Sequence, residues 1–292
     1  MNRLPVSLAV AIMVLSPAAL AKTVDAVASF SVLADIVKQV GGDHVTVTSL
    51  VGPDGDPHSF EPAPKDSQAL NKADVVFVSG LGMEGWMDRL ITASGYKGKV
   101  ITASTGVSTR KMEEEGKTVT DPHAWNSAKN GAIYARNVMA ALIAADPEDA
   151  AYFRRQGDAY TEKLEKLDSW AKSEFASIPA AKRKVITSHD AFGYFGAEYG
   201  VEFLAPVGFS TESEASASDV AALIKQIKQE HIQTYFIENQ TDPRLVKQVA
   251  AASGARPGGE LYPESLSKAG GPATTYEAAF KHNVETMVAS MR

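Results

Sequence analysis

The chain has 292 residues, enough for one large domain or two ordinary ones, and 45% of them are hydrophobic, as in globular proteins. It contains six histidines but no cysteine, which excludes disulfide bonds, cysteine nucleophiles, iron–sulfur clusters and thiolate zinc sites. The net charge of −6 argues against a nucleic-acid partner, because such proteins present a basic face.

The first 21 residues have the three parts of a secretory signal peptide. Arg3 supplies the basic start, Leu4 to Leu15 is mostly apolar, and Ala19-Leu20-Ala21 is a cleavage site of the A-x-A type. Because no cysteine follows Ala21, we expect an exported periplasmic protein that is freely soluble and carries no lipid anchor.

Short apolar runs rich in β-branched residues then alternate with helical patterns, which predicts parallel sheets covered by helices on both faces. The expected helices include 32–40, 219–229 and 245–252. Four strands precede a long gap and four follow it, so the pattern predicts two α/β lobes, each with a four-stranded parallel sheet. The expected strands are 24–30, 44–51, 73–79, 99–104, 184–188, 203–207, 234–238 and 260–262.

The gap between the two sets of strands predicts one long helix. Asp146-Pro147 suggests an N-cap followed by proline in the first turn, and apolar residues from Phe153 to Phe175 recur at helical spacing. We therefore divide the chain into a signal peptide, an N-terminal lobe, a long linking helix or spine and a C-terminal lobe. Their ranges are 1–21, 22–146, 147–178 and 179–292.

Three of the six histidines follow predicted strands, at the sheet edge where open α/β folds bind ligands. His58 and His123 belong to the first lobe, and His189 belongs to the second. Three imidazoles that converge on a cleft would bind a borderline-soft cation. Glu264 follows the last strand and is the nearest fourth ligand, with Glu260 as the alternative. We assign structural roles to the other three histidines, which are His44, His231 and His282.

One motif points elsewhere. Residues 80–85 match the G-x-G-x-x-G pattern of dinucleotide-binding folds, and they follow a predicted strand. However, no acidic residue stands about 20 positions further on to bind a ribose, and the strand is the third of its lobe. We interpret these glycines as forming a turn that lets Trp86 pack nearby.

The segments around the candidate ligands resemble those of the solute-binding proteins of bacterial zinc and manganese ABC importers. The resemblance covers nearly the whole chain after the signal peptide, and its specificity comes from the order and spacing of the segments. They are Gly55-Asp56-Pro57-His58, Gly80-Leu81-Gly82-Met83-Glu84, Asp121-Pro122-His123-Ala124-Trp125, Ser188-His189-Asp190-Ala191-Phe192, Tyr262-Pro263-Glu264-Ser265-Leu266-Ser267 and the stretch from Thr275 to Asn283.

The resemblance implies two α/β lobes bridged by one long helix, with His58, His123 and His189 as metal ligands. The fourth ligand of the family is usually aspartate, and here the matching position is Glu264. The Asp-Pro that usually follows the second ligand is replaced by Asn126-Ser127-Ala128. The segment 111–117, which is rich in histidine in many zinc-binding members, has acidic residues but no histidine, and we expect a solvated loop there.

A third histidine in place of glutamate is typical of the zinc-binding members, and imidazole ligands suit Zn²⁺ better than Mn²⁺. We therefore predict a monomeric, non-enzymatic carrier that captures Zn²⁺ between the lobes and delivers it to an ABC permease in the inner membrane. A periplasmic metallochaperone would be a further partner. The alternatives are a manganese carrier, a zinc hydrolase in which Glu264 is a base rather than a ligand, and a binding protein for an organic solute.

Overall fold

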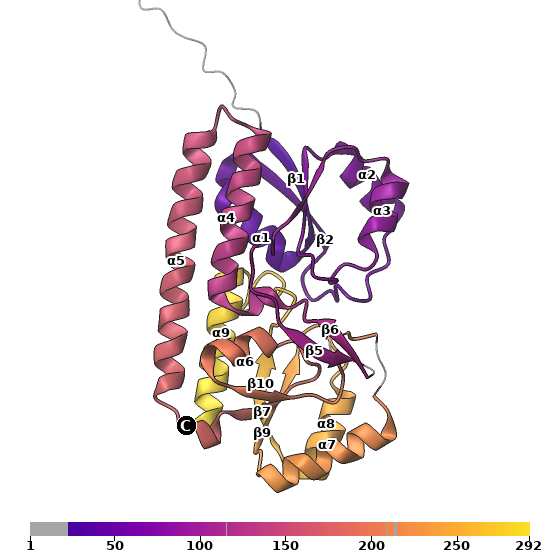
Figure 1. The fold of residues 1–292 in the computed structure, drawn as a ribbon, viewed down its shortest axis with the longest axis vertical. Coiled ribbons are helices and arrows are strands. Elements are labelled where there is room, and N and C mark those ends of the chain that lie inside the picture. Colours follow the sequence, from indigo (N-terminus) through magenta and orange to yellow (C-terminus); the bar gives the residue numbers. More distant parts are fainter. Residues whose placement is uncertain (1–22, 115, 209, 213–214) are drawn as a thin grey trace, which may run out of the picture.

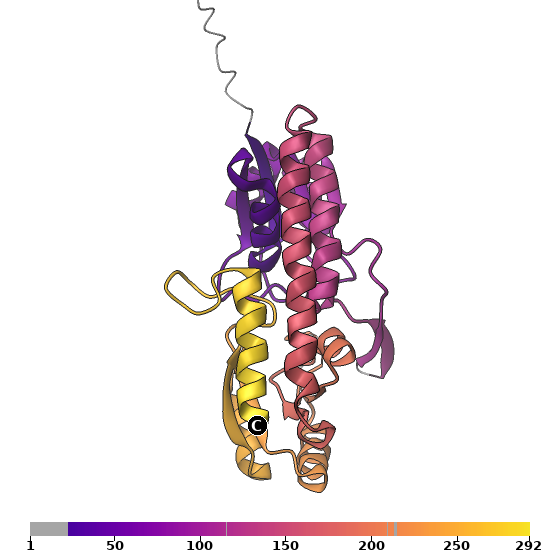
Figure 2. The ribbon, with the colours of Figure 1, turned by 90° about the vertical axis from the view of Figure 1, so that its left-hand side faces the viewer.

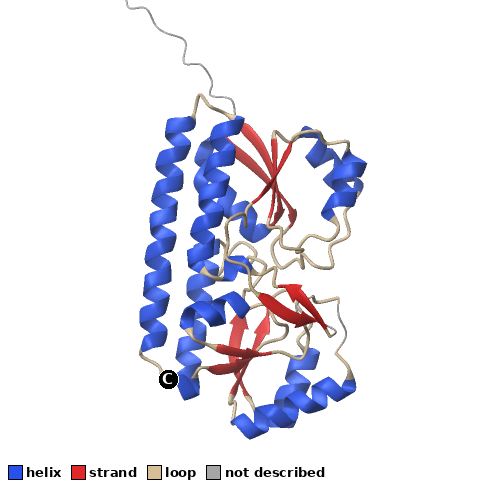
Figure 3. Cartoon of the chain, viewed as in Figure 1, coloured by secondary structure: helices blue, strands red, loops and turns tan. Residues whose placement is uncertain are grey.

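The computed structural model describes residues 23–114, 116–208, 210–212 and 215–292. The predicted signal peptide and its cleavage site lie outside these residues. Two parallel four-stranded sheets form the centres of two lobes, as expected, and helices flank both of them (Figures 1 and 3). Within the described part of the chain, no helix is long and apolar enough to cross a membrane.

The N-terminal sheet has the order β2-β1-β3-β4. Its central strand β1 is buried at six of its seven positions, because helices cover both faces of a parallel sheet. Helix α1 follows β1 directly and buries an apolar stripe against the sheet. The strands are β1 (Val24–Phe30), β2 (Val45–Val51), β3 (Val75–Val78) and β4 (Lys99–Thr102), and the helices are α1 (Ser31–Gly41), α2 (Pro64–Lys72) and α3 (Met87–Ser94).

The C-terminal sheet has the order β10-β9-β7-β8, again with every pair parallel. Helices α7 and α8 pack together on it around a small apolar cluster of their own, which includes Ile186, Ile227 and Val249. The strands are β7 (Lys184–Ile186), β8 (Glu202–Leu204), β9 (Thr234–Glu238) and β10 (Arg256–Leu261), and the helices are α6 (Gly193–Tyr199), α7 (Ala217–Glu230), α8 (Arg244–Ser253) and α9 (Tyr276–Met291).

Two antiparallel helices, α4 (Ala128–Ala145) and α5 (Ala150–Ala176), connect the lobes. Helix α5 has 27 residues, so it is roughly 40 Å long at about 1.5 Å per residue, and it runs beside both lobes (Figures 1 and 2). Helix α9 lies alongside it. The main apolar core continues from the first sheet through these helices into the second lobe, which fixes the lobes against each other.

Three details of the sequence prediction were wrong. Helix α4 was missed, and Asp146 caps the C-terminus of α4 instead of starting α5, whose N-cap is Asp149. The segment expected to be a solvated loop is a hairpin of β5 (Lys111–Glu114) and β6 (Lys117–Thr120). It forms because Gly116 takes a positive φ of 73° at the turn and Met112 is buried.

Candidate metal centre

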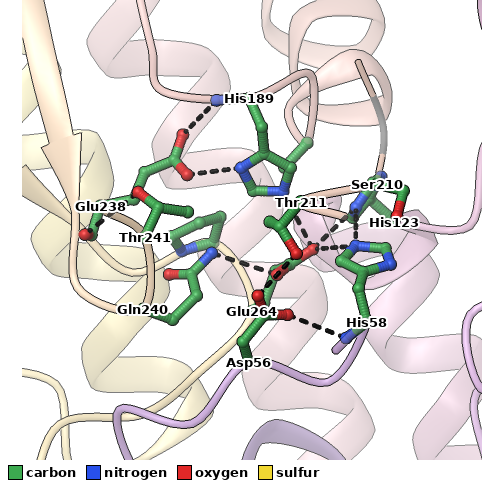
Figure 4. A network of polar contacts seen from close by, with 12 residues as sticks. Asp56, His58, His123, His189, Ser210, Thr211, Glu238, Gln240, Thr241 and Glu264 are labelled. Atoms are coloured by element: carbon green, nitrogen blue, oxygen red, sulfur yellow. Dashed lines mark hydrogen bonds and ion pairs between the residues drawn. The ribbon is translucent and has the colours of Figure 1, made fainter. Parts of the chain in front are cut away.

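His58, His123, His189 and Glu264 converge between the lobes, although they are far apart in the sequence (Figure 4). One ligand atom from each residue lies within 4.8 Å of the others, and all four residues are buried. We call this group the His3Glu cluster. The structure therefore brings together the four residues that the sequence singled out, and their role as ligands is taken up below as a proposal.

The carboxylate of Glu264 is the centre of the cluster. Its Oε1 atom lies 2.8 Å from Nε2 of His58, 2.8 Å from Nε2 of His123 and 3.1 Å from Nε2 of His189. Two of the imidazoles also approach each other, with 3.2 Å between Nε2 of His58 and Nε2 of His123. Three nitrogen atoms and one oxygen atom therefore point at a common space the size of an ion.

Local sequence explains how the first two histidines are held. Both stand third in an Asp-Pro-His sequence, and in each case the backbone N–H of the histidine donates to Oδ1 of the aspartate two residues before it. The distances are 2.9 Å for His58 to Asp56 and 3.0 Å for His123 to Asp121. Such Asx turns, with a proline at the middle position, fix the backbone of a loop.

His189 is held by a carboxylate from another strand. It lies just beyond β7, where Glu238 at the end of β9 accepts the backbone N–H of Ser188 at 3.0 Å and that of His189 at 3.2 Å. The other oxygen of Glu238 lies 2.5 Å from Nδ1 of His189. In parallel sheets neighbouring strands end at the same edge, so Glu238 reaches the site from the strand next to β7.

Buried carboxylates orient two of the imidazoles. Nδ1 of His123 donates to Oδ1 of Asp121 at 2.9 Å, and Nδ1 of His189 donates to Glu238, because an ionised carboxylate only accepts. This leaves Nε2 of both rings facing Glu264. Carboxylates behind metal-binding histidines fix the tautomer in the same way.

The charges of the site favour a positive species in its centre. Burial opposes protonation of His123, but hydrogen bonds to Asp121 and Glu264 outweigh it and raise the pKa of His123 to about 9. Burial also opposes protonation of His189, yet Glu238 and Glu264 raise its pKa well above the usual range. Burial would raise the pKa of Glu264, but His58 and His189 hold it well below its usual value. Three buried carboxylates therefore attract protons or a cation.

An open cavity of about 760 Å³ reaches the cluster from the C-terminal lobe. His189 and Gln240 line it, and Gln240 also contacts Glu264, with 3.1 Å between Nε2 of Gln240 and Oε2 of the carboxylate. On the same side Thr211 donates to Asp56 at 2.5 Å and so joins a loop of the second lobe to the loop that carries His58.

The remaining candidates lie elsewhere. Glu260, the alternative fourth ligand, accepts a hydrogen bond from the hydroxyl of Tyr262 outside the cluster. His44 pairs with Asp149, His231 caps α7 and His282 bonds to a carbonyl of the C-terminal lobe. Sequence reasoning missed Glu238 and Gln240 as parts of the site. A charged residue at the end of an apolar, buried strand was the available signal for Glu238.

The glycine-rich turn already binds a carboxylate of this chain with the amides at its start. Gly80, Leu81 and Gly82 all take positive φ, and the partly buried carboxylate of Glu84 accepts the backbone N–H groups of Ser79 and Gly80. Trp86, which follows this turn, is buried, and its indole N–H donates to the carbonyl of Pro57, one residue before His58. The turn therefore supports the His58 loop, in agreement with its interpretation as a packing element.

The chain is similar to metal-binding components of bacterial ABC transporters. The family model described as "Zinc-uptake complex component A periplasmic" matches residues 26–290. The manganese-binding lipoprotein MntA of Bacillus subtilis is 34% identical over 274 residues, which cover 91% of this chain and 89% of MntA. The iron ABC transporter substrate-binding lipoprotein MtsA of Streptococcus pyogenes is 35% identical over 268 residues, covering 89% and 86%.

Among solved structures, the periplasmic zinc binding protein TroA from Treponema pallidum has a TM-score of 0.86 at 30% identity and covers 92% of this chain and 99% of its own. The names of these relatives correct one prediction. We expected an exported protein without a lipid anchor, but MntA and MtsA are both named lipoproteins. That prediction was wrong because it depended only on the absence of cysteine, whereas the similarity to lipoproteins extends over nearly the whole chain.

Proposed function

The chain belongs to the family of the periplasmic zinc-uptake component A, and from this premise we propose that it captures Zn²⁺ at the His3Glu cluster and hands it to an ABC importer. The single observation that carries the proposal is the convergence of three Nε2 atoms and one carboxylate oxygen in a buried space between the lobes. Four protein ligands saturate the tetrahedral coordination that Zn²⁺ prefers, so the site holds the ion without leaving a position for water.

Zinc is proposed over manganese on the chemistry of the ligands. Three imidazole nitrogens and one carboxylate suit Zn²⁺, whereas Mn²⁺ prefers sites with more oxygen atoms. The relatives do not decide between them, since their names mention manganese, iron and zinc. The observation that supports a carrier rather than a hydrolase is the position of Glu264, whose Oε1 faces all three Nε2 atoms as a ligand would.

A metal-binding experiment tests the proposal. The protein purified without chelator should contain about one Zn per chain, and in competition titrations Zn²⁺ should displace Mn²⁺. His123→Ala removes one proposed ligand and should weaken zinc binding strongly, because metal affinity depends on every side chain that coordinates the ion directly. His282→Ala is the matched control, since it removes a histidine outside the cluster. Equal zinc affinity of the two variants would refute the site, and displacement of Zn²⁺ by equimolar Mn²⁺ would refute the choice of metal.

A further inference from the structure

We infer that Gln240 is a specificity-determining residue, which holds the Glu264 carboxylate so that only one of its oxygen atoms faces the ion. The inference rests on the proposed function, because it concerns how the same site chooses its cation. It assigns Gln240 no contact with the metal. Gln240 acts through Glu264 and is therefore a positioning residue.

The two oxygen atoms of Glu264 have different partners. Oε1 faces the three imidazoles at 2.8 to 3.1 Å, whereas Oε2 accepts the Nε2–H of Gln240 at 3.1 Å (Figure 4). A glutamate side chain has three rotatable bonds, and a carboxylate in this position could present one oxygen or both. The hydrogen bond from Gln240 stabilises the orientation in which Oε2 points away from the imidazoles.

The orientation of the Gln240 amide follows from its surroundings. If the amide were reversed, its oxygen would face the carboxylate of Glu264, and the two would repel each other. In the orientation present, the amide oxygen of Gln240 is buried without a hydrogen-bond partner among the described residues. The amide of Gln240 therefore keeps its hydrogen bond to Glu264 even though its own oxygen stays buried without a partner among the described residues, which is energetically unfavourable.

The turn that carries Gln240 is anchored to both lobes. The side chain of its neighbour Asn239 donates to Oδ1 of Asp54 at 3.0 Å and to the carbonyl of Ser265 at 3.2 Å. Ser265 directly follows Glu264, so the turn and the ligand segment are tied at two points. Gln240 therefore approaches Glu264 from a fixed base rather than from a free loop.

A carboxylate that offers one oxygen completes a four-coordinate site, and one that offers two oxygens creates a five-coordinate site richer in oxygen. Zn²⁺ prefers four ligands, while Mn²⁺ prefers higher coordination and more oxygen. By keeping Oε2 out of the coordination sphere, Gln240 would disfavour Mn²⁺ more than Zn²⁺. Its removal should therefore change the ratio of the two affinities, not only their size.

Gln240→Met tests this inference, because methionine has nearly the same length but cannot donate a hydrogen bond. Gln240→Ala is the second variant, and Gln248→Met is the matched control, since Gln248 lines the same cavity and has no bond to the cluster. Affinities for Zn²⁺ and Mn²⁺ would be measured by competition with a chelating dye. The absorption spectrum of the Co²⁺-loaded protein reports coordination, because four-coordinate Co²⁺ absorbs more strongly than five-coordinate Co²⁺.

We expect Gln240→Met and Gln240→Ala to shift the affinity ratio toward Mn²⁺ by about tenfold, the lower end of the effect of residues behind metal ligands. Their Co²⁺ bands should weaken, while Gln248→Met should match the unmodified protein. An unchanged ratio and spectrum, or an equal loss of both metals, would overturn the inference. If the unmodified protein bound neither metal, the proposed function itself would fail, which is a different result.

Discussion

The Glu238→Gln substitution tests the electrostatic support behind the cluster most directly. In the protein Oε1 of Glu238 accepts two backbone N–H groups, and Oε2 accepts Nδ1–H of His189 at 2.5 Å. Glutamine has nearly the same shape, and its oxygen can keep the two backbone bonds. Its amide group would then face Nδ1 of His189 with a donor instead of an acceptor.

The consequence is a change of tautomer. To accept from the new amide, His189 must give up the proton on Nδ1 and keep its proton on Nε2, the atom that faces Glu264 and the proposed ion. Binding of Zn²⁺ would then require the proton to leave Nε2 and the hydrogen bond at Nδ1 to break. Carboxylates behind metal-binding histidines are worth about 10- to 100-fold in affinity, or roughly 1.4 to 2.8 kcal/mol.

Zinc affinity would be measured by competition with a chelator, with circular dichroism as the check of folding. Glu260→Gln is the matched control, because Glu260 lies on the adjacent strand β10 and its carboxylate accepts a hydrogen bond from the hydroxyl of Tyr262, outside the cluster. We expect a loss of at least about tenfold for Glu238→Gln and less than about twofold for the control. A folded Glu238→Gln protein with unchanged zinc affinity would refute the reasoning.

Three further predictions concern the same charges. Zinc affinity should rise with pH up to about 9, by about tenfold per pH unit for each proton displaced, because Zn²⁺ must replace a proton on His123. A flat titration profile would contradict this. The free energy of unfolding of the metal-free protein should fall by roughly 3 kcal/mol as pH rises from about 6.5 to about 9, because the raised pKa of His123 stabilises the folded state only while the imidazole is protonated. Denaturant titrations at several pH values would measure this change, and stability that rises over this range would contradict it. Glu264→Gln should weaken zinc binding by at least about tenfold, because it removes the negative charge of this ligand as well as its coordination. If calorimetry gave this variant the same zinc affinity as the unmodified protein, water would replace Glu264 as the fourth ligand.

The sequence predicted the elements that repeat a simple pattern. Strands β1 and β9 were expected at their observed bounds, because a parallel strand buried on both faces is a continuous apolar run with polar residues at its ends. Helix α4 was missed because five of its eight buried residues are alanine or glycine, which do not stand out as an apolar face. The hairpin β5–β6 was missed because most of its described side chains are polar and exposed, and Met112 is the one buried among them.

The same contrast holds within the site. The four residues of the His3Glu cluster were found because each follows a strand or stands in a short motif, and parallel strands deliver their ends to one edge. Glu238 orients His189, and Gln240 orients Glu264. Whether these side chains meet depends on the order of strands in the sheet and on the path of a turn. Strand β9 lies beside β7 in the sheet although α6, β8 and α7 separate them in the chain. Sequence spacing therefore predicts which atoms bind the ion, whereas the residues that orient those atoms follow only from the packed structure.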